Sequence, residues 1–224
     1  MADPGYYVVT PYDNEGVRVI DLRYWTVKPD GGTEVAWPEI GLGYGVNSRW
    51  TTEFLLSYIG SSQMPTRLST VNWINDVLLT QGELPFDLAL HLQLVSDRIH
   101  ADRRSVEFGP VLQTDVGRTQ LNGNLFFEHV YGPDTPDATL LKYQWQIRHR
   151  WMPQMHVGVQ GFGELGPWNN WSTGAKQSHR AGPVVYGIFR LDDRRAMKMQ
   201  AAYLFGKTYG QGGHELSLRA WYEF

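Results

Sequence analysis

Charged side chains recur at alternate positions along the chain, and acids and bases occupy different parts of it. The first seven alternating segments carry one base, Arg23, on their polar face, together with the acids Asp21, Glu39, Glu53, Asp76, Asp87, Glu107 and Glu128. The last five carry Glu164 and Glu223 on that face, together with the bases Lys142, Arg148, Arg150, Lys198 and Arg219. Two opposed arcs of this kind, facing each other across a low-dielectric cavity, would produce a transverse field that orients dipolar solutes. The alternative is a set of buried salt bridges that fills the interior.

Covalent and metal chemistry have weaker support. The chain has no cysteine, which excludes disulfides, thiolate zinc sites and iron–sulfur clusters. Ser–His–acid catalysis depends on proximity in space, and no sequence spacing links Ser61 or Ser62 to any of the histidines. For His91 and His156 a hydrogen-bonded histidine is a simpler interpretation than a metal ligand. We expect no catalytic residue, metal or cofactor, and an enzyme that acts on lipid or peptide remains an alternative.

Period-two alternation is the pattern that must position these groups. In the segment 86–94, phenylalanine and leucine occupy one face, whereas Asp87, Ala89, His91 and Gln93 occupy the other. This pattern is typical of a strand with one apolar face. The same reasoning predicts strands over 16–27, 33–46, 50–61, 68–79, 86–97, 103–114, 119–131, 139–151, 155–164, 181–190, 197–206 and 215–224. We therefore predict an all-β, antiparallel, twelve-stranded barrel that forms a single domain over residues 1–224.

Composition excludes several other classes of protein. The net charge of -3 offers no basic excess for binding nucleic acid. The apolar runs are far shorter than the roughly 18 residues that a membrane-spanning helix needs. The first residues lack the basic and apolar regions of an export signal, and we expect such a signal to have been removed before Ala2.

The length of the strands and the positions of the aromatic residues favour lipid on the apolar face. Ten residues tilted by about 45° span roughly 23 Å, close to the apolar band of about 25 Å in outer-membrane barrels. Aromatic residues near the predicted strand ends suit interfacial girdles: these are Tyr24, Trp50, Tyr58, Tyr131, Trp151, Tyr203, Tyr222 and Phe224. A soluble β-sandwich or a lipocalin-like barrel, with the apolar face inside, is the alternative.

With these features the chain resembles a Gram-negative outer-membrane β-barrel of the porin-like kind. Its end carries the most specific match, because Phe224, Tyr222 and Ser217 fit the terminal signal read by the barrel-assembly machinery, whereas Arg219 stands where glycine is common. The resemblance implies an outer-membrane location and a monomeric barrel in contact with lipid and lipopolysaccharide. It also implies a channel that passes or binds a small polar solute. A non-conducting structural or binding barrel stays open as an alternative.

The resemblance also implies that the polar face lines a pore. The expected pore-lining set consists of the acids and bases of the two arcs, with His91. Whether the pore is open or plugged remains undecided: inward Gly41, Gly43, Gly45 and Gly109 make space, and inward Trp25, Phe126, Phe162, Phe189 and Trp221 fill it. Twelve strands lie between the filled interior of eight and the aqueous channel of sixteen.

Connections and prolines give further expectations. Short turns are predicted at 47–49, 115–118, 152–154 and 191–196 on the periplasmic side, together with a longer inner turn at 80–85. The external connections are predicted at 28–32, 62–67, 98–102, 132–138, 165–180 and 207–214. Pro38, Pro110 and Pro183 lie inside predicted strands, where each predicts a bulge or a shifted boundary. At Pro38 the alternation also changes phase, which would place Trp37 and Ile40 on the same lipid-facing side.

Overall fold

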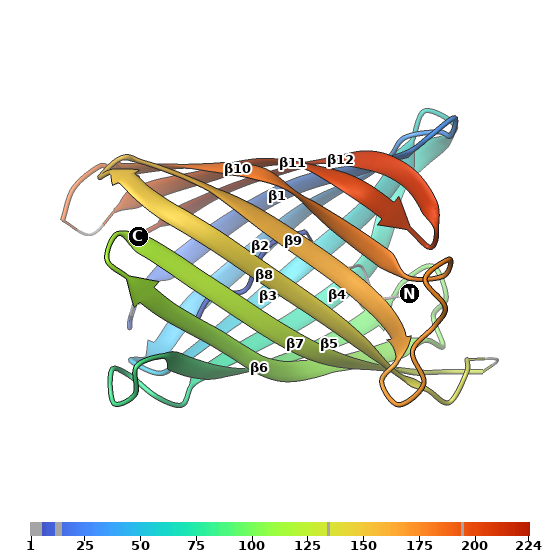
Figure 1. The fold of residues 1–224 in the computed structure, drawn as a ribbon, viewed down its shortest axis with the longest axis horizontal. Coiled ribbons are helices and arrows are strands. Elements are labelled where there is room, and N and C mark those ends of the chain that lie inside the picture. Colours follow the sequence, from blue (N-terminus) through green and yellow to red (C-terminus); the bar gives the residue numbers. More distant parts are fainter. Residues whose placement is uncertain (1–5, 12–14, 134, 194) are drawn as a thin grey trace.

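The computed structural model describes residues 6–11, 15–133, 135–193 and 195–224. Its fold is a closed antiparallel barrel of twelve strands, as the alternation predicts. The strands are β1 (Arg18–Pro29), β2 (Val35–Asn47), β3 (Trp50–Ser61), β4 (Met64–Leu78), β5 (Asp87–Asp97), β6 (Arg104–Val116), β7 (Thr119–Tyr131), β8 (Thr139–Met152), β9 (Met155–Pro167), β10 (Ser178–Arg190), β11 (Ala196–Thr208) and β12 (Gln211–Glu223). They run diagonally around the barrel, from blue β1 to red β12 (Figure 1).

Pairing of the first strand with the last closes the sheet. In β1 and β12, Val19 lies opposite Glu223 and Trp25 opposite Ser217. The backbones of Arg18 and Phe224 exchange two hydrogen bonds, of 2.9 and 3.0 Å, at the end of this pair. Every strand therefore has two hydrogen-bonded neighbours, and the sheet has no free edge.

Side chains alternate between a polar interior and an apolar exterior. Asp21 is 0% exposed, whereas the adjacent Leu22 is 50% exposed. In β5, His91 is 1% exposed between Leu90 at 45% and Leu92 at 37%. This arrangement is the reverse of a soluble barrel, which buries its apolar face. The apolar exterior is that of a barrel surrounded by lipid.

In the part of the chain that the structure describes, no helix is long and apolar enough to cross a membrane.

The connections at the end that holds the C-terminus are mostly tight, as expected. Only residues 117–118 and 153–154 join β6 to β7 and β8 to β9. At the opposite end, the predicted connections 62–67 and 207–214 are too long. Only residues 62–63 separate β3 from β4, and only residues 209–210 separate β11 from β12. At that end the connection of residues 168–177 lies away from the C-terminus (Figure 1).

The hairpin between β11 and β12 illustrates why these strands are longer than predicted. Tyr209 and Gly210 form a two-residue turn with φ values of 47° and 81°. Positive φ at both central residues matches the right-handed twist of a tight hairpin. The Tyr209 hydroxyl donates a 2.7 Å hydrogen bond to Glu164. Burial, together with the nearby Glu164 carboxylate, raises the pKa of Tyr209 above its ordinary value, so the donor proton is retained.

The predicted bulges at the three strand prolines are wrong. The register is the same on both sides of Pro38, Pro110 and Pro183 on every neighbouring strand. Each proline instead interrupts the pairing with one neighbour without an offset. Before two of the prolines stands a glycine, Gly109 or Gly182, at which an added Cβ would collide with the backbone carbonyl of the next strand. At these two positions the backbones of the neighbouring strands therefore approach closely.

Two predicted orientations are also wrong. Trp37 faces the interior, where its ring stacks on Trp25 with centroids 4.1 Å apart. The alternation therefore keeps its phase through Pro38, since Ile40 is 43% exposed on the outer face. Phe189 is 51% exposed and lies on the outer face, because Tyr186 of the same strand points inward. It takes no space from the lumen.

Candidate functional site in the barrel lumen

The residues Tyr6–Pro11, here called the lumenal segment, lie inside the barrel. Ser217 of β12 donates a hydrogen bond of 3.1 Å to the carbonyl oxygen of the segment's first residue. Three residues further on, the backbone N–H of Val9 donates to Gln144 of β8 at 3.0 Å, and Asn124 of β7 donates to the Val9 carbonyl at 2.9 Å. Because β12 lies far around the wall from β7 and β8, the segment crosses the interior.

An apolar block forms around the start of this segment. The Tyr6 ring meets Trp25 of β1 edge-on at 5.0 Å and Phe162 of β9 edge-on at 5.4 Å. Val184 and Leu204, 1% and 0% exposed, complete the block from β10 and β11. Aromatic pairs in this geometry add about 0.5–1.5 kcal/mol beyond the area they bury. Sequence reasoning missed this role for Tyr6, because no strand precedes residue 16 and no pattern places the segment.

A cavity of about 500 Å³ lies beside this block. It reaches the end of the barrel with the short turns, since Gly45, Thr51 and Asp115 are among its lining residues. The cavity brings together most of the predicted pore-lining set: Asp21, Arg23, Glu39, Glu53, Asp76, His91, Glu107, Arg148, Arg150, Lys198 and Arg219.

Three members of the predicted set lie elsewhere. Lys142 lines a second, much smaller cavity of about 20 Å³ beside Tyr6. Glu128, 1% exposed, forms an ion pair with Lys142. Asp87 lies at the start of β5, where it accepts a 2.9 Å hydrogen bond from the backbone N–H of Gly82.

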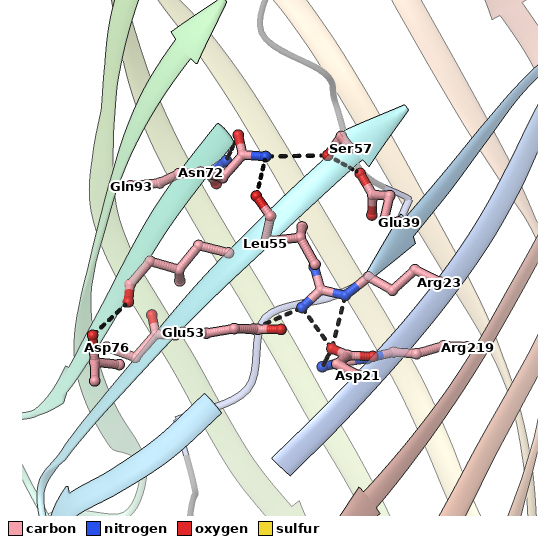
Figure 2. A network of polar contacts seen from close by, with 12 residues as sticks. Asp21, Arg23, Glu39, Glu53, Leu55, Ser57, Asn72, Asp76, Gln93 and Arg219 are labelled. Atoms are coloured by element: carbon pink, nitrogen blue, oxygen red, sulfur yellow. Dashed lines mark hydrogen bonds and ion pairs between the residues drawn. The ribbon is translucent and has the colours of Figure 1, made fainter. Parts of the chain in front are cut away.

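The densest ion cluster joins β12, β1 and β3 (Figure 2). The Asp21 carboxylate forms ion pairs with Arg219 at 2.6 Å and with Arg23 at 2.7 Å, and its side chain is fully buried. Arg23 also reaches Glu53 at 2.8 Å. A buried carboxylate needs such partners, because desolvation alone would disfavour its charged form. The cluster therefore couples the two strands that close the barrel.

A chain of hydrogen bonds runs from Glu39 across β3, β4 and β5, which belong to the acidic arc (Figure 2). Ser57 donates to Glu39 at 2.7 Å, Asn72 donates to Ser57 at 3.1 Å, and Gln93 donates to Asn72 at 3.2 Å. Further along, the ring of His91 lies 2.6 Å from Asp76. Among the described residues no group of three or more acidic or histidine side chains has the geometry of a metal site. The absence of a metal or cofactor stays a prediction.

Bases of the opposite arc reach acids at several points. Lys142 lies 2.7 Å from both Glu107 and Glu128. Arg150 lies 2.9 Å from Asp115, and Lys198 forms an ion pair with Glu223. The Lys142 and Arg150 pairs bridge the two arcs, whereas Lys198 and Glu223 belong to the same arc. A transverse field across the remaining cavity stays a prediction.

Sequence reasoning missed one buried ion pair, Arg180 of β10 with Glu215 of β12. Both side chains are almost fully buried, and the Arg180 guanidinium lies 4.7 Å from the centre of the Tyr6 ring. Arg180 was missed because β10 was predicted to begin at residue 181. The alternation of Ser178 and Arg180, both buried, extends the strand back and could have revealed it.

The residues of the predicted assembly signal differ in their exposure to solvent. The rings of Tyr222 and Phe224 stack with centroids 5.5 Å apart, and Phe224 is 41% exposed. Ser217 is fully buried and contacts Tyr6 inside the lumen. Recognition by the assembly machinery stays a prediction for all three residues.

Comparisons with known proteins agree on the fold. No family model matches the chain, and no curated protein sequence matches it. Among solved structures, the COG4313 outer membrane channel from Pseudomonas putida F1 is similar with a TM-score of 0.65 and 14% identity, over 100% of both chains. The NanC porin gives 0.59 and 10% identity, over 92% of this chain and 98% of that one. The KdgM porin in complex with disordered oligogalacturonate gives 0.56 and 8%, with the same shares of the two chains. The chain therefore has the fold of outer-membrane channels.

Proposed function

We propose that the chain is an outer-membrane channel that passes small polar solutes through its lumen. The observation that carries this proposal is a charged cavity of about 500 Å³ inside a barrel whose exterior is apolar. Lipid outside and water inside account for both faces. A purely structural barrel would have no need of such a space.

The similar structures support the same proposal. The COG4313 protein is described as an outer membrane channel, and NanC and KdgM are described as porins. One of the KdgM structures is a complex with oligogalacturonate, a polar and acidic sugar polymer. This analogy supports a location in the bacterial outer membrane. We further propose that the chain is a monomer, surrounded by lipid and lipopolysaccharide and inserted by the barrel-assembly machinery.

The lumenal segment gives the proposed channel a closed conformation. The apolar block around Tyr6 lies between the large cavity and the small cavity beside Arg180. Solutes would reach the cavity from the end with the short turns, and passage to the other end requires displacement of the segment. The segment is held by burial of its side chains in the apolar block, by hydrogen bonds to wall side chains and by ring contacts. It takes no part in the strand pairing, which its displacement would leave intact.

A non-conducting binding barrel is the second candidate, and the same apolar block favours it. If the segment never leaves, the cavity is a blind pocket that binds solute without passing it. An enzymatic function has no comparable support, because the described lumenal groups pair mainly into ion clusters.

Swelling of proteoliposomes distinguishes the two candidates. Vesicles containing the folded protein are diluted into isosmotic arabinose, glucose, raffinose or potassium acetate, and the change in light scattering is recorded. A channel gives swelling rates that fall with the size of the uncharged sugar. Rates equal to those of protein-free vesicles, both for the wild type and for Tyr6→Ala/Tyr7→Ala, with insertion verified by protease protection, would exclude a channel and favour the binding barrel.

A further inference from the structure

Among the described residues, one base of the lumen lacks an acidic partner. Arg148 lines the large cavity and forms no ion pair with any described residue. All other bases that line the two lumenal cavities form ion pairs with carboxylates. A guanidinium inside a low-dielectric wall without a counter-ion is costly unless an anion or water reaches it.

The position of Arg148 is fixed by two neighbours. Its Nε–H donates a 2.9 Å hydrogen bond to Nδ1 of His156 on β9. The guanidinium carbon lies 4.2 Å from the centre of the Tyr186 ring on β10. These contacts orient the guanidinium plane and occupy only one of its nitrogens. The two terminal nitrogens have no hydrogen-bond partner among the described residues.

The wall beside Arg148 leaves room for a ligand. Arg148 lies opposite Gly158 of β9 in the strand register. An added Cβ at Gly158 would collide with the backbone carbonyl of Ile147, so the strand approach itself requires glycine. The inward position between His156 and Gln160 therefore carries no side chain, and Arg148 itself is among the residues that line the cavity. Tyr186 and Ile188 supply apolar surface on the same side.

We propose that Arg148 binds the carboxylate of a small organic monoanion in the large cavity. The two free terminal nitrogens form the fork that accepts a carboxylate through two parallel hydrogen bonds. Its single uncompensated charge matches a monoanion, because the neighbouring bases Arg150 and Lys198 are already neutralised by Asp115 and Glu223. The apolar part of the ligand packs against Tyr186. This inference deepens the proposed function, on which it rests for the route by which the anion reaches the cavity.

The test measures binding of butyrate to the full chain folded in detergent, by saturation-transfer difference NMR, with butylammonium as a cation of similar size. Wild type is expected to give saturable binding of butyrate and none of butylammonium. Arg148→Gln should weaken butyrate binding about tenfold or more, since charge-assisted bidentate hydrogen bonds are the strong ones. Arg148→Lys keeps the charge without the fork, and its affinity for butyrate should lie between those of the wild type and Arg148→Gln.

Two further variants separate a direct contact from a general effect of charge. Arg150→Gln removes the same charge two residues along β8 and should change affinity by about twofold at most, because Arg150 is already paired and partly screened. Arg104→Gln, exposed at the start of β6, should leave binding unchanged. Three outcomes would each overturn the proposal. They are an equal loss of butyrate affinity in the three charge-removing variants, unchanged butyrate binding by Arg148→Gln, and no butyrate binding by the wild type.

These outcomes are independent of those of the swelling assay. A protein that passes uncharged sugars but does not bind butyrate refutes only the site at Arg148. A protein that binds butyrate through Arg148 but passes no sugar keeps this site and loses the channel.

Discussion

The ring of Tyr6 lies edge-on to the ring of Trp25, with their centroids 5.0 Å apart in the middle of the lumen. Tyr6 belongs to a segment that forms no strand, whereas Trp25 belongs to the wall. The contact therefore joins the lumenal segment to the wall of the barrel. In the proposed channel, it is this contact that restricts passage.

The variant Tyr6→Ala/Tyr7→Ala should open the lumen. Removal of both rings takes away the edge-on contacts with Trp25 and Phe162 and the Tyr7 hydroxyl bond to the Leu218 carbonyl. We expect a larger single-channel conductance or a longer open time in planar bilayers. The control is Tyr24→Ala/Tyr203→Ala, which removes two outward-facing rings, 39% and 41% exposed. Identical conductance in the two variants would show that the segment does not restrict the lumen.

Lys142→Met should destabilise the barrel strongly. Lys142 lies 2.7 Å from both Glu107 and Glu128, and its removal leaves two buried carboxylates without their base. Breaking a buried ion pair from one side costs about 3–5 kcal/mol. Urea unfolding in lipid vesicles, followed by tryptophan fluorescence, measures the difference. In the control, Arg150→Met, the pair with Asp115 is about 40% exposed and the loss should stay below about 1 kcal/mol. Similar losses of unfolding free energy in the two variants would show that the ion pairs of Lys142 with Glu107 and Glu128 are not shielded from water.

Neutralising Arg148, Arg150 and Lys198 together, each to glutamine, should raise the cation selectivity of the channel. The change removes three positive charges from one wall and frees Asp115 and Glu223 from their ion pairs. The reversal potential under a KCl gradient reports the shift.

The matched control for this triple variant removes the same charge at the opposite end of the barrel. Arg67, Arg98 and Arg104 are exposed there, and their replacement by glutamine should change the reversal potential less. If the lumenal triple variant has wild-type selectivity and conductance, these side chains do not line the narrow part of the pore.

Gly182→Ala should reduce stability by about 1–3 kcal/mol, the usual cost of overpacking. A Cβ at this position would meet the Tyr203 carbonyl of the adjacent strand, and Pro183 already interrupts the pairing there. Gly123→Ala is the control, because nothing lies within 4 Å of a Cβ at that position. The midpoint of urea unfolding should fall only for Gly182→Ala, and an equal midpoint would show that β10 can move away from β11.

The alternation of the strands made the fold predictable, because each strand has one apolar face on the exterior and one face toward the lumen. Asp21 and Leu22 differ from 0% to 50% exposure over a single residue, and a period of two records that difference directly. Strand ends were harder to place: β10 begins at Ser178 and β12 at Gln211, both earlier than predicted, because polar residues there face both sides. The proline bulges failed as predictions because the loss of one N–H is local and need not shift the register.

The contents of the lumen were predictable only in part. Which charged residues face inward follows from their strand position, and most of them line the large cavity. Their partners do not follow, because contacts such as Lys142 with Glu107 join strands that are not adjacent. The lumenal segment has no periodicity at all, so Tyr6 and Tyr7 gave no signal before the fold was known.

Current across a planar lipid bilayer shows whether solutes pass through this lumen. The wild-type protein, folded in detergent and inserted, is recorded in symmetric 1 M KCl, followed by the Tyr6→Ala/Tyr7→Ala variant under the same conditions. We predict discrete current steps that are rare or small for the wild type and frequent or large for the variant. Silent membranes for both proteins, with insertion verified, would contradict the channel and leave a closed binding barrel.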